Sequence, residues 1–578
     1  MLSILKKINF LVSKVQRKKL IILSFLLFVG MILEFLGLGI LIPVLNILID
    51  SNEFSQNKYL MSLRNFFPQI SDQKFILLLL GFVVIFYIIK TCFLVLLTFK
   101  QNRFLSNLNA SISNKLFSSY LNQPYEYHLK SDSSDLIKNL QIEVSYFFAF
   151  MTSLINIFIE GGLILSIAIT LIIIEPFGTL ALSLFLMLLT LIFYKLTKTR
   201  LDLWGQNRQE LDLNSAKIIT DGLGAIRDLI ISRRVYFYIK KFNSLSFEKA
   251  KVTSNHIFLT QLPKFYFELV SISGIVLFIF ILILTEKSTA ALIATLGVFV
   301  AGVFRALPSL NRLVTSIQNL KFYNASVDII YNDLVSFSNV NIKQNSIKKL
   351  ELQKKISLDK ITFKYGDKTV LEDISFDIFK NQSIGIIGES GAGKSTLVDL
   401  IVGLQKPDEG KILIDNKDLN TISDQWMSSI GYISQNIFLI NDTIENNIAL
   451  GIPQDQISSS RINKVIAQVQ LTSYIDDLPN RLKTKVGERG IQISGGQKQR
   501  IGIARALYLN PEILILDEAT SALDNDTEKS ILRSFRLLKG KKTIIIVSHR
   551  HSSLQNCDTI FKIKDGKILK TNKLKSEI

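Results

Sequence analysis

The sequence predicts a membrane α-helical domain fused to a cytoplasmic α/β domain. Of the 578 residues, 48% are hydrophobic, and the mean hydropathy of +0.32 is higher than ordinary soluble proteins carry. Long apolar runs fill residues 20 to about 305, whereas residues 350–578 have the charged, mixed composition of a soluble domain. We therefore expect a transmembrane domain over residues 1–335, a polar linker over 336–350 and a second domain over 351–578.

Six apolar runs are long enough to be transmembrane helices, because a hydrocarbon core of ~30 Å requires about 20 residues. They lie near residues 20–48, 75–99, 145–174, 177–194, 266–284 and 288–307. Only Glu175–Gly178 separates the third run from the fourth, and this Pro-Gly break predicts a tight turn between antiparallel helices.

Lys and Arg residues are concentrated in the N-terminal segment and in the two long loops that follow the second and fourth spans. Basic loops remain on the cytoplasmic side, so both chain ends are expected there. This distribution also explains the net charge of +19 better than a nucleic-acid partner does, and we expect none.

Three segments outside the spans have patterns of their own. The apolar spacing in "KYLMSLRNFF" (58–67) predicts a short amphipathic helix, either at the membrane interface or packed on the protein surface. The turns "LNQPYEYH" (121–128) and "DGLGAIRDL" (221–229) combine helix breakers with apolar residues. They are either solvated turns or short elements that contact the second domain.

The second domain contains a P-loop in its required context. The segment "IGIIGESGAGKSTL" is an apolar strand, a glycine-rich loop and a helix start. Backbone N–H groups of such a loop surround phosphate oxygens, Lys394 is expected at the β- and γ-phosphates, and Ser395 is expected to bind Mg²⁺. The predicted ATP-binding residues of this segment are Gly388, Glu389, Ser390, Gly391, Ala392, Gly393, Lys394, Ser395 and Thr396.

A second apolar strand ends in two carboxylates in "EILILDEAT". The first of these residues, Asp517, is expected to bind Mg²⁺. The second, Glu518, is placed where it can act as a general base toward an attacking water.

Between these strands, Ser494, Gly495, Gly496 and Gln497 in "ISGGQKQR" match the signature of ABC ATPases, and the other motifs of that family follow in order. The resemblance implies four further roles. They are adenine stacking by Tyr365, Mg²⁺ sensing by Gln435, an interface loop at Asp524 and a γ-phosphate switch at His549, with His551 beyond the matching position.

In that family, the signature of one subunit completes the ATP site of the other. One chain carries one P-loop and one signature, so the resemblance implies a homodimer that uses ATP and Mg²⁺. Six spans followed by one nucleotide domain resemble exporter-type half-transporters. In these proteins the segments 121–128 and 221–229 are coupling helices, and "VGERG" (486–490) touches them.

Four cations in or beside the apolar runs bear on the substrate. Residues seven apart on a helix return to within about 20° of the same face, so Arg305 and Arg312 are expected to point together. Lys90 and Lys264 have the same charge. A charge at the bilayer centre costs ~2.5–3.5 kcal/mol, and such groups usually face a polar cavity. We interpret the four as the substrate-binding residues of a cavity for an anionic, phosphate-bearing substrate.

Two alternatives stay open for these cations. Arg312 and Lys264 could extend to the cytoplasmic surface without lining a cavity. In addition, Glu34 and Glu160 lie in apolar runs and could pair with some of the cations.

The membrane half also resembles bacterial ABC flippases for lipid-linked oligosaccharides of protein N-glycosylation, through "FRALPSLNRLVTS", "NASVDIIYNDL" and "NKYLMSL". The resemblance implies ATP-driven flipping of a polyprenyl-diphosphate-linked oligosaccharide across the bacterial inner membrane. Lys90 and Lys264 stand where arginine is expected, which keeps the charge but loses bidentate geometry. The alternative is a multidrug or lipid exporter of the same architecture.

Overall fold

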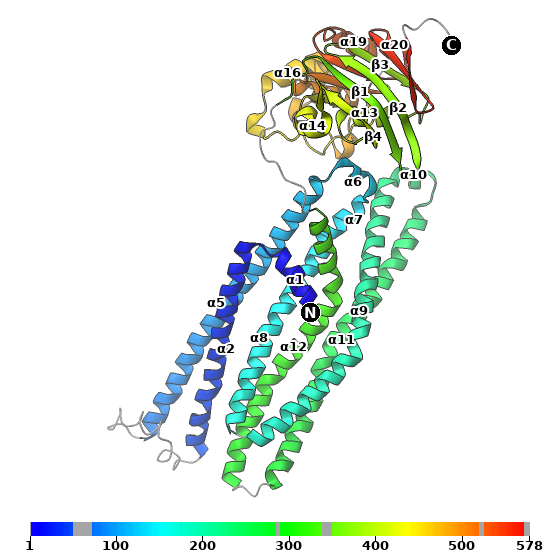
Figure 1. Ribbon diagram of the computed structural model, residues 1–578. Helices are drawn as coiled ribbons and strands as arrows, with labels where there is room; N and C mark the ends of the chain where they lie inside the picture. Colours follow the sequence, from blue (N-terminus) through cyan, green and yellow to red (C-terminus); the bar gives the residue numbers. More distant parts are fainter. Residues whose placement is uncertain are drawn as a thin grey trace. The chain divides into compact units, whose positions relative to one another are not determined.

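The computed structural model describes residues 2–49, 72–174, 176–284, 289–337, 349–519 and 525–571. Its contacts divide the chain into two units, Met1–Gln123 with Tyr127–Ile342, and Pro124–Glu126 with Lys343–Ile578. The first unit is helical and the second is mainly an α/β unit (Figure 1). The helix expected over 58–67 and residues 338–348 of the expected linker lie outside the described residues.

The helical unit consists of long helices joined by short ones (Figure 1). Its elements are α1 (Leu2–Leu11), α2 (Lys14–Ile49), α5 (Asp72–Leu121), α6 (Tyr125–Lys130), α7 (Ser133–Lys138), the π-helix η1 (Asn139–Glu143), α8 (Val144–Ile174), α9 (Pro176–Gly224), α10 (Ile226–Ile231), α11 (Val235–Leu284) and α12 (Thr289–Ser336). The segments 121–128 and 221–229, expected as turns, contain the short helices α6 and α10.

The longest helices exceed the thickness of a membrane. Helices α5 and α11 have 50 residues each, α9 has 49 and α12 has 48. At 1.5 Å per residue they are ~70–75 Å long, more than twice the ~30 Å of a hydrocarbon core. The helices therefore continue well beyond the bilayer, as the helix-forming loops of the sequence predict.

Within the described residues, three segments combine the length and hydropathy needed to cross a membrane: Lys14–Gly37, Lys74–Leu121 and Ser133–Ile173. They correspond to the first three predicted spans. The fourth, fifth and sixth predicted spans fall in α9, α11 and α12. Helix α8 ends at Ile174 and α9 begins at Pro176, which agrees with the break expected there, since proline suits the first position of a helix.

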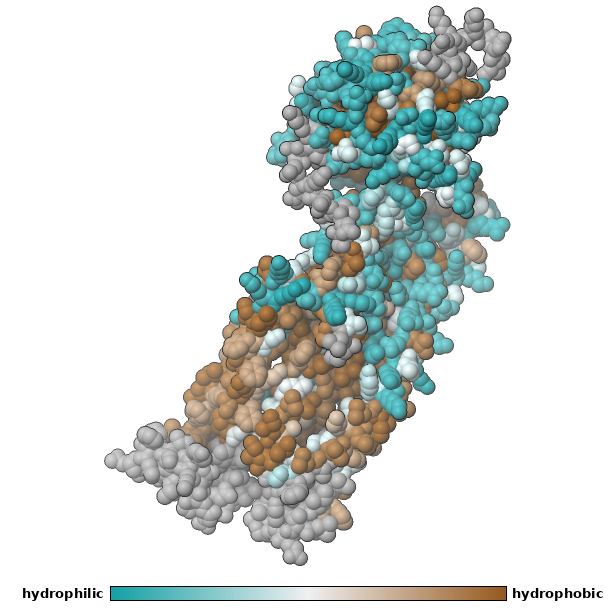
Figure 2. Space-filling model, viewed as in Figure 1, coloured by the Kyte–Doolittle hydropathy of each residue, from teal (hydrophilic) through white to brown (hydrophobic). Residues whose placement is uncertain are grey.

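Apolar side chains gather on the surface of the helical unit (Figure 2). Ile22 and Phe25 on α2, and Ile89 and Leu96 on α5, are each about 60% exposed. Exposed apolar patches of this extent mark contact with lipid or another protein in a chain with such helices.

The described residues of the α/β unit form ten strands. They are β1 (Lys355–Tyr365), β2 (Lys368–Phe379), β3 (Ser383–Gly388), β4 (Glu409–Ile414), β5 (Lys417–Asp418), β6 (Ile430–Ile433), β7 (Ile513–Asp517), β8 (Thr543–Val547), β9 (Thr559–Lys564) and β10 (Lys567–Thr571). One antiparallel sheet has the order β2-β1-β4-β5, and the other sheet has the order β10-β9-β3-β8-β7-β6 with parallel pairing from β9 to β6.

Helices cover these sheets. They are α13 (Lys394–Val402), α14 (Leu419–Met427), α15 (Ile444–Ile448), α16 (Ser459–Gln468), α17 (Thr472–Asp476), α18 (Gly495–Tyr508), α19 (Asn525–Arg536) and α20 (His551–Leu554), with 3₁₀ turns at Gln454–Gln456, Arg481–Lys483 and Glu488–Gly490. Strands β7 and β8 are buried along their whole length, which explains their continuous apolar sequences.

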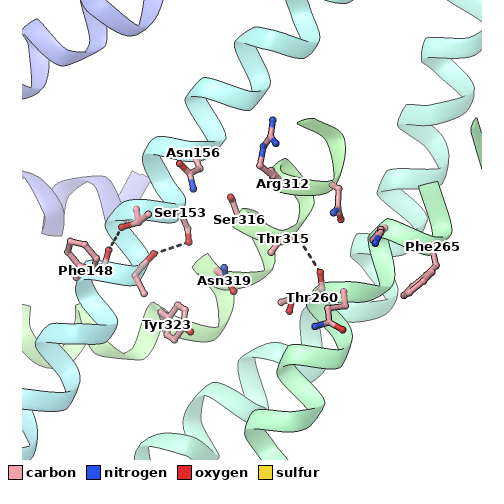
Figure 3. A pocket seen from close by; sticks show the side chains of 15 residues that line it. Phe148, Ser153, Asn156, Thr260, Phe265, Arg312, Thr315, Ser316, Asn319 and Tyr323 are labelled. Carbon is pink, nitrogen blue, oxygen red and sulfur yellow. Dashed lines mark hydrogen bonds between the residues drawn. The ribbon is translucent and has the colours of Figure 1, made fainter. Parts of the chain in front are cut away.

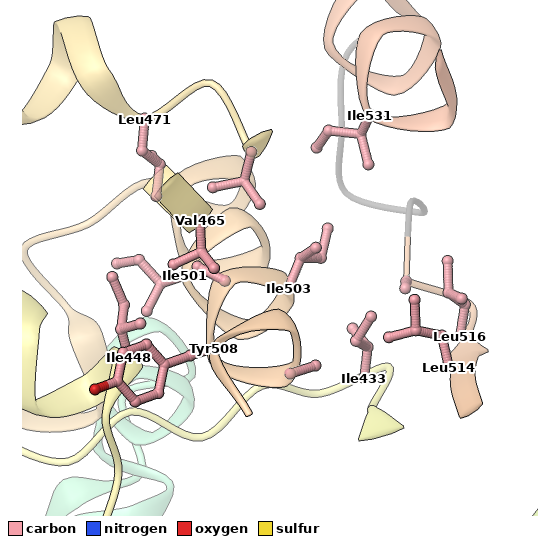
Figure 4. Packing of buried hydrophobic residues seen from close by; sticks show 14 of the residues in the cluster. Ile433, Ile448, Val465, Leu471, Ile501, Ile503, Tyr508, Leu514, Leu516 and Ile531 are labelled. Atoms are coloured by element: carbon pink, nitrogen blue, oxygen red, sulfur yellow. The ribbon is translucent and has the colours of Figure 1, made fainter. Parts of the chain in front are cut away.

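Helix α18 lies in a core of buried aliphatic side chains. Ile501 and Ile503 of α18 pack in one cluster with Leu514 and Leu516 of β7 and with residues of α15, α16 and α19 (Figure 4). Burial of aliphatic side chains is worth about 1.5–3 kcal/mol each, so this core holds α18 against the strand that carries Asp517.

Candidate functional site

The register of the parallel sheet brings the predicted ATP-site residues together. Val547 of β8 pairs with Ile386 of β3 on one side and with Asp517 of β7 on the other, and Ile433 of β6 pairs with Leu516 of β7. The carboxyl ends of all four strands therefore meet at one edge, where an α/β sheet places its ligand. The P-loop, Gln435, Glu518 and His549 all follow these strand ends.

The P-loop joins β3 to α13. Gly393, at the N-cap of α13, has φ +97°, and a Cβ there would lie 2.9 Å from Leu371 Cδ2, so both the backbone angle and the space require glycine. Lys394 Nζ donates hydrogen bonds to the carbonyl oxygens of Gly388 at 2.9 Å and Glu389 at 2.8 Å. The amino group thus spans the loop whose N–H groups are expected to surround phosphate.

Glu518 lies between two other predicted catalytic residues. Gln435 Nε2 donates to Glu518 Oε2 at 2.7 Å, and His549 Nδ1 lies 3.5 Å from Glu518 Oε1. The backbone of Glu518 has φ +48°, in the left-handed region that a non-glycine residue rarely adopts, and its N–H donates to Val547 O. Strain of this kind costs about 1–3 kcal/mol and is concentrated at functional sites.

The residues expected to bind Mg²⁺ supply hard oxygen donors: the Ser395 hydroxyl, the Asp517 carboxylate and the Gln435 side-chain carbonyl. Tyr432 Oη donates to Asp517 Oδ2 at 3.2 Å. Burial, and then the charge of Glu518, raise the pKa of Asp517. Burial, and then Asp517, raise the pKa of Asp399 to about 6. Two buried carboxyl groups that resist ionisation near each other suit a bound cation, so the residues fit Mg²⁺.

Tyr365 ends β1 with a ring that is 47% exposed. Its hydroxyl accepts a hydrogen bond from Gln405 Nε2 at 2.8 Å, and the rings of Phe363 and Tyr365 form a T-shaped pair with a centroid distance of 5.0 Å. A half-exposed aromatic ring held at its hydroxyl is suited to stacking on a base.

The signature residues form the start of α18. Ser494 is the N-cap, and Ser494 and Gln497 exchange hydrogen bonds in a capping box, with N–O distances of 3.3 and 3.0 Å. Among the described hydrogen bonds and ion pairs, none joins Ser494–Gln497 to the P-loop. Farther along α18, Gln499 donates to the backbone oxygen of Glu518 at 3.4 Å. Asp524 lies outside the described residues, and His551 begins α20.

In the helical unit, three of the four predicted substrate-binding cations are paired with carboxylates. Lys90 Nζ lies 2.8 Å from Glu34 Oε2, and both side chains are nearly fully buried. Arg305 Nη2 contacts both Glu34 oxygens at 2.8 Å. Glu34 thus accepts from two cations.

The second ion pair joins α12 to α8. Arg312 binds Glu160 through Nε and through Nη2, the latter at 3.1 Å. Arg305 and Arg312, expected to point together, each bind a carboxylate of a different helix, Glu34 of α2 for the first and Glu160 of α8 for the second. Lys264 has no ion pair among the residues that the structure describes, and its ammonium group lies 5.9 Å from the centre of the Phe265 ring. Four cations and two carboxylates leave a net charge of +2 per chain.

A polar cavity of about 850 Å³ lies between α8, α11 and α12 (Figure 3). Its lining includes Lys264 and Arg312 but not Lys90 or Arg305, so the four cations fall into two groups. Four side-chain amides line it, those of Asn156, Gln261, Asn311 and Asn319. Its lining also includes the aromatic rings of Phe148, Phe265 and Tyr323. The buried Oδ1 of Asn311 has no hydrogen-bond partner within the described chain.

Sequence reasoning missed a buried charged cluster next to this cavity. Arg208, Glu143 and Asp212 are each at most 1% exposed, and Arg208 lies 3.8 Å from an oxygen of each carboxylate. Its guanidinium group stacks 3.8 Å from the ring centre of Tyr146. The π-helix η1 ends at Glu143. The (i, i+4) spacing of Arg208 and Asp212 is a sequence signal for that pair, but nothing in the sequence indicates that Glu143 joins it.

Comparison with known proteins relates both units to one architecture. The family model "ABC transporter" matches residues 371–521. An export ATP-binding/permease protein of Rickettsia typhi is 26% identical over 83% of this chain and 85% of its own length. ATP-dependent lipid A-core flippases of Idiomarina loihiensis and Saccharophagus degradans are 40% and 37% identical, over 37% and 49% of this chain and 37% and 47% of their own lengths.

A solved structure, that of a bacterial Atm1-family ABC exporter with ATP bound, superposes with a TM-score of 0.77 over 96% of this chain and 95% of the other, at 21% identity. The chain therefore has the ABC exporter fold, a helical transmembrane domain fused to an α/β P-loop ATPase domain. The matched domain binds ATP.

Proposed function

We propose that this ABC exporter-type half-transporter, an ATPase coupled to transport, forms a homodimer that flips a polyprenyl-diphosphate-linked oligosaccharide across the bacterial inner membrane. The observation that carries the proposal is the cavity between α8, α11 and α12, where Lys264 and Arg312 stand among four side-chain amides. A phosphate-bearing group is attracted by the cations, and hydroxyl-rich sugars can exchange hydrogen bonds with the amides.

The ion pairs change how this cavity is expected to work. Arg312 is held by Glu160, and a negatively charged head group would have to compete with that carboxylate. Lys264 has no such competitor among the described residues, so we expect it to make the first contact with a diphosphate. With Arg312 paired to Glu160, the two cavity cations leave one uncompensated positive charge per chain, and a homodimer presents it twice.

The names of two relatives support a lipid with a large polar head. Both are ATP-dependent lipid A-core flippases, which the chain matches over less than half of its length. The alternative is a multidrug or lipid exporter with another substrate. The pairing of Glu34 and Glu160 with three of the cations favours this alternative. A cation that is already paired with a carboxylate has a structural role and needs no phosphate partner.

In the proposed cycle, Lys394 and the P-loop bind the phosphates. Ser395, Asp517 and Gln435 would hold Mg²⁺, which would supply positive charge next to the phosphates. Glu518 accepts a proton from the attacking water, and His549 contacts the γ-phosphate. Among the described hydrogen bonds none joins the N-terminus of α18 to its own P-loop, and the partner's P-loop is its proposed target. Closure of two such sites drives the transition between cavity orientations.

The test is Lys264→Gln in proteoliposomes containing defined polyprenyl-diphosphate glycans. A charge-assisted hydrogen bond is worth about 1.5–3 kcal/mol, so the flipping rate at low substrate should fall roughly 10- to 100-fold. The matched control is Lys251→Gln, which removes the same charge from an exposed position of α11 outside the cavity.

The double variant Arg305→Ala with Arg312→Ala should also stop flipping and leave basal ATP hydrolysis within about twofold, because the ATP site lies in the other domain. Unchanged flipping in both cavity variants would exclude the proposed substrate and support the multidrug or lipid exporter.

A further inference from the structure

A second cavity in the helical unit has no role in the proposal above. It has a volume of about 290 Å³ and lies between α8, α9, α11 and α12. Its walls are almost entirely aliphatic, and include Ile167, Ala168, Leu171, Ala306, Leu307 and Leu313.

Three of the four hydroxyl groups that line this apolar cavity donate to backbone oxygens, and the fourth belongs to Thr190. Thr179 Oγ1 donates to Leu171 O at 2.9 Å, Ser183 donates to Leu180 O at 3.0 Å, and Ser271 donates to Phe267 O. A buried water needs two to four polar partners, which these walls do not offer. Apolar cavities of ~150 Å³ in other proteins bind small hydrocarbons, and this one is larger.

The apolar cavity continues the polar cavity along the same helices. On α8 the polar cavity is lined between Phe148 and Asn156, and the apolar cavity between Ile164 and Leu171. The eight residues from Asn156 to Ile164 correspond to ~12 Å of helix. Along α12 the linings of the two cavities adjoin in height but lie on opposite sides of the helix, because Asn311 and Arg312 line the first, whereas Leu310 and Leu313 line the second.

This arrangement matches a molecule with a polar end and a hydrocarbon end. An empty apolar cavity leaves its wall atoms without dispersion contacts, and a hydrocarbon chain restores them. Because the two cavities are close together, the hydrocarbon segment nearest to the head group would occupy the apolar cavity.

We propose that the apolar cavity holds the hydrocarbon segment adjacent to the head group of the transported lipid. One protomer of the dimer would then bind both the head group and this hydrocarbon segment. The identity of the head group rests on the proposed function. The apolar cavity selects for the hydrocarbon part of the lipid, and the polar cavity selects for its head group.

The test uses farnesyl diphosphate with a photoreactive diazirine at the end of its chain, bound to the full-length protein in proteoliposomes. Crosslinked peptides are quantified by mass spectrometry. In the native protein the label is expected mainly in residues 164–171 and 302–313. Ala168→Phe fills the cavity and should reduce this labelling at least fivefold. The matched control is Ile169→Phe, at a neighbouring position of α8 that is 51% exposed, which should leave the labelling unchanged.

Ala306→Phe fills the same cavity from α12. It provides a second test of the proposal if the Ala168→Phe variant does not fold. Labelling that both filling variants leave unchanged would overturn the proposal. A diazirine-bearing phosphatidylcholine that labels residues 164–171 as strongly as the diphosphate would overturn it too, because the cavity would then hold bilayer lipid. If farnesyl diphosphate labels the cavity in native protein and in Lys264→Gln alike, the proposed head-group site fails while the chain site stands.

Discussion

Replacement of Glu34 by Gln tests whether the membrane cations depend on their carboxylate. Glu34 accepts from Lys90 and Arg305 at 2.8 Å, and the Lys90 and Glu34 side chains are 4% and 8% exposed. Glu34→Gln leaves two cations facing a neutral amide. Breaking a buried ion pair costs about 3–5 kcal/mol, and a charge at the bilayer centre ~2.5–3.5 kcal/mol. Because glutamine can still accept one hydrogen bond, we expect the free energy of unfolding to fall by about 3 kcal/mol, at the lower end of this range.

The assay is reversible unfolding of the purified protein in mixed micelles, followed by circular dichroism. Asp328→Asn is the control, because it removes a carboxylate from a more exposed ion pair. Asp328 lies 2.7 Å from Lys7, and 40% of the Asp328 side chain and 28% of the Lys7 side chain are exposed. An exposed pair contributes at most about 1 kcal/mol to the free energy of unfolding. Lys90→Met combined with Glu34→Gln should recover at least half of the loss, because Lys90 is the more buried of the two cations, with 4% of its side chain exposed against 49% for Arg305. A loss below about 1 kcal/mol for Glu34→Gln alone would refute the reasoning.

Two further predictions concern the ATPase domain. Glu518→Gln should lower ATP turnover by about 10²- to 10⁴-fold while ATP binding, measured with a fluorescent nucleotide, stays intact; normal turnover would show that another base acts. The pKa of Asp399 is raised to about 6 from 3.8, so the folded protein binds more protons than the unfolded chain between these values, and its unfolding free energy should fall as the pH rises from about 4 to 6. Asp399→Asn should remove this contribution, which urea unfolding at pH 4.5 and pH 7 can measure; an unchanged pH dependence would contradict it.

The ATP site could be predicted largely from the sequence because its parts are local motifs on neighbouring strands. Gly388, Asp517 and Val547 each end an apolar run, and parallel strands of one sheet bring their carboxyl ends to one edge. The contact of Gln435 and His549 with Glu518 follows from that register. The left-handed backbone at Glu518 did not follow, because its sequence neighbourhood contains no glycine to indicate it.

The cations of the membrane half were located by the sequence, but their partners were not. Lys90 and Glu34 are 56 residues apart, and Arg305 and Glu34 are 271 apart. No periodicity connects positions at such separations, since the packing of α2 against its neighbours decides them. The same holds for Arg208 and Glu143 of the π-helix η1, whereas Asp212 lies one helical turn from Arg208 on α9, a spacing that periodicity does connect.

The sequence by itself determined which segments are apolar enough to form long helices, where the nucleotide motifs stand, and that cations enter the membrane half. These properties depend on residues close together in the chain, through helical and strand periodicity and through the phosphate-binding loop. Only the tertiary structure decided which cations are neutralised, that Lys264 remains without an ion pair in the described chain, and that a polar and an apolar cavity adjoin along α8 and α12. Ion pairs and cavities are made by side chains from different helices, so they exist only once those helices pack.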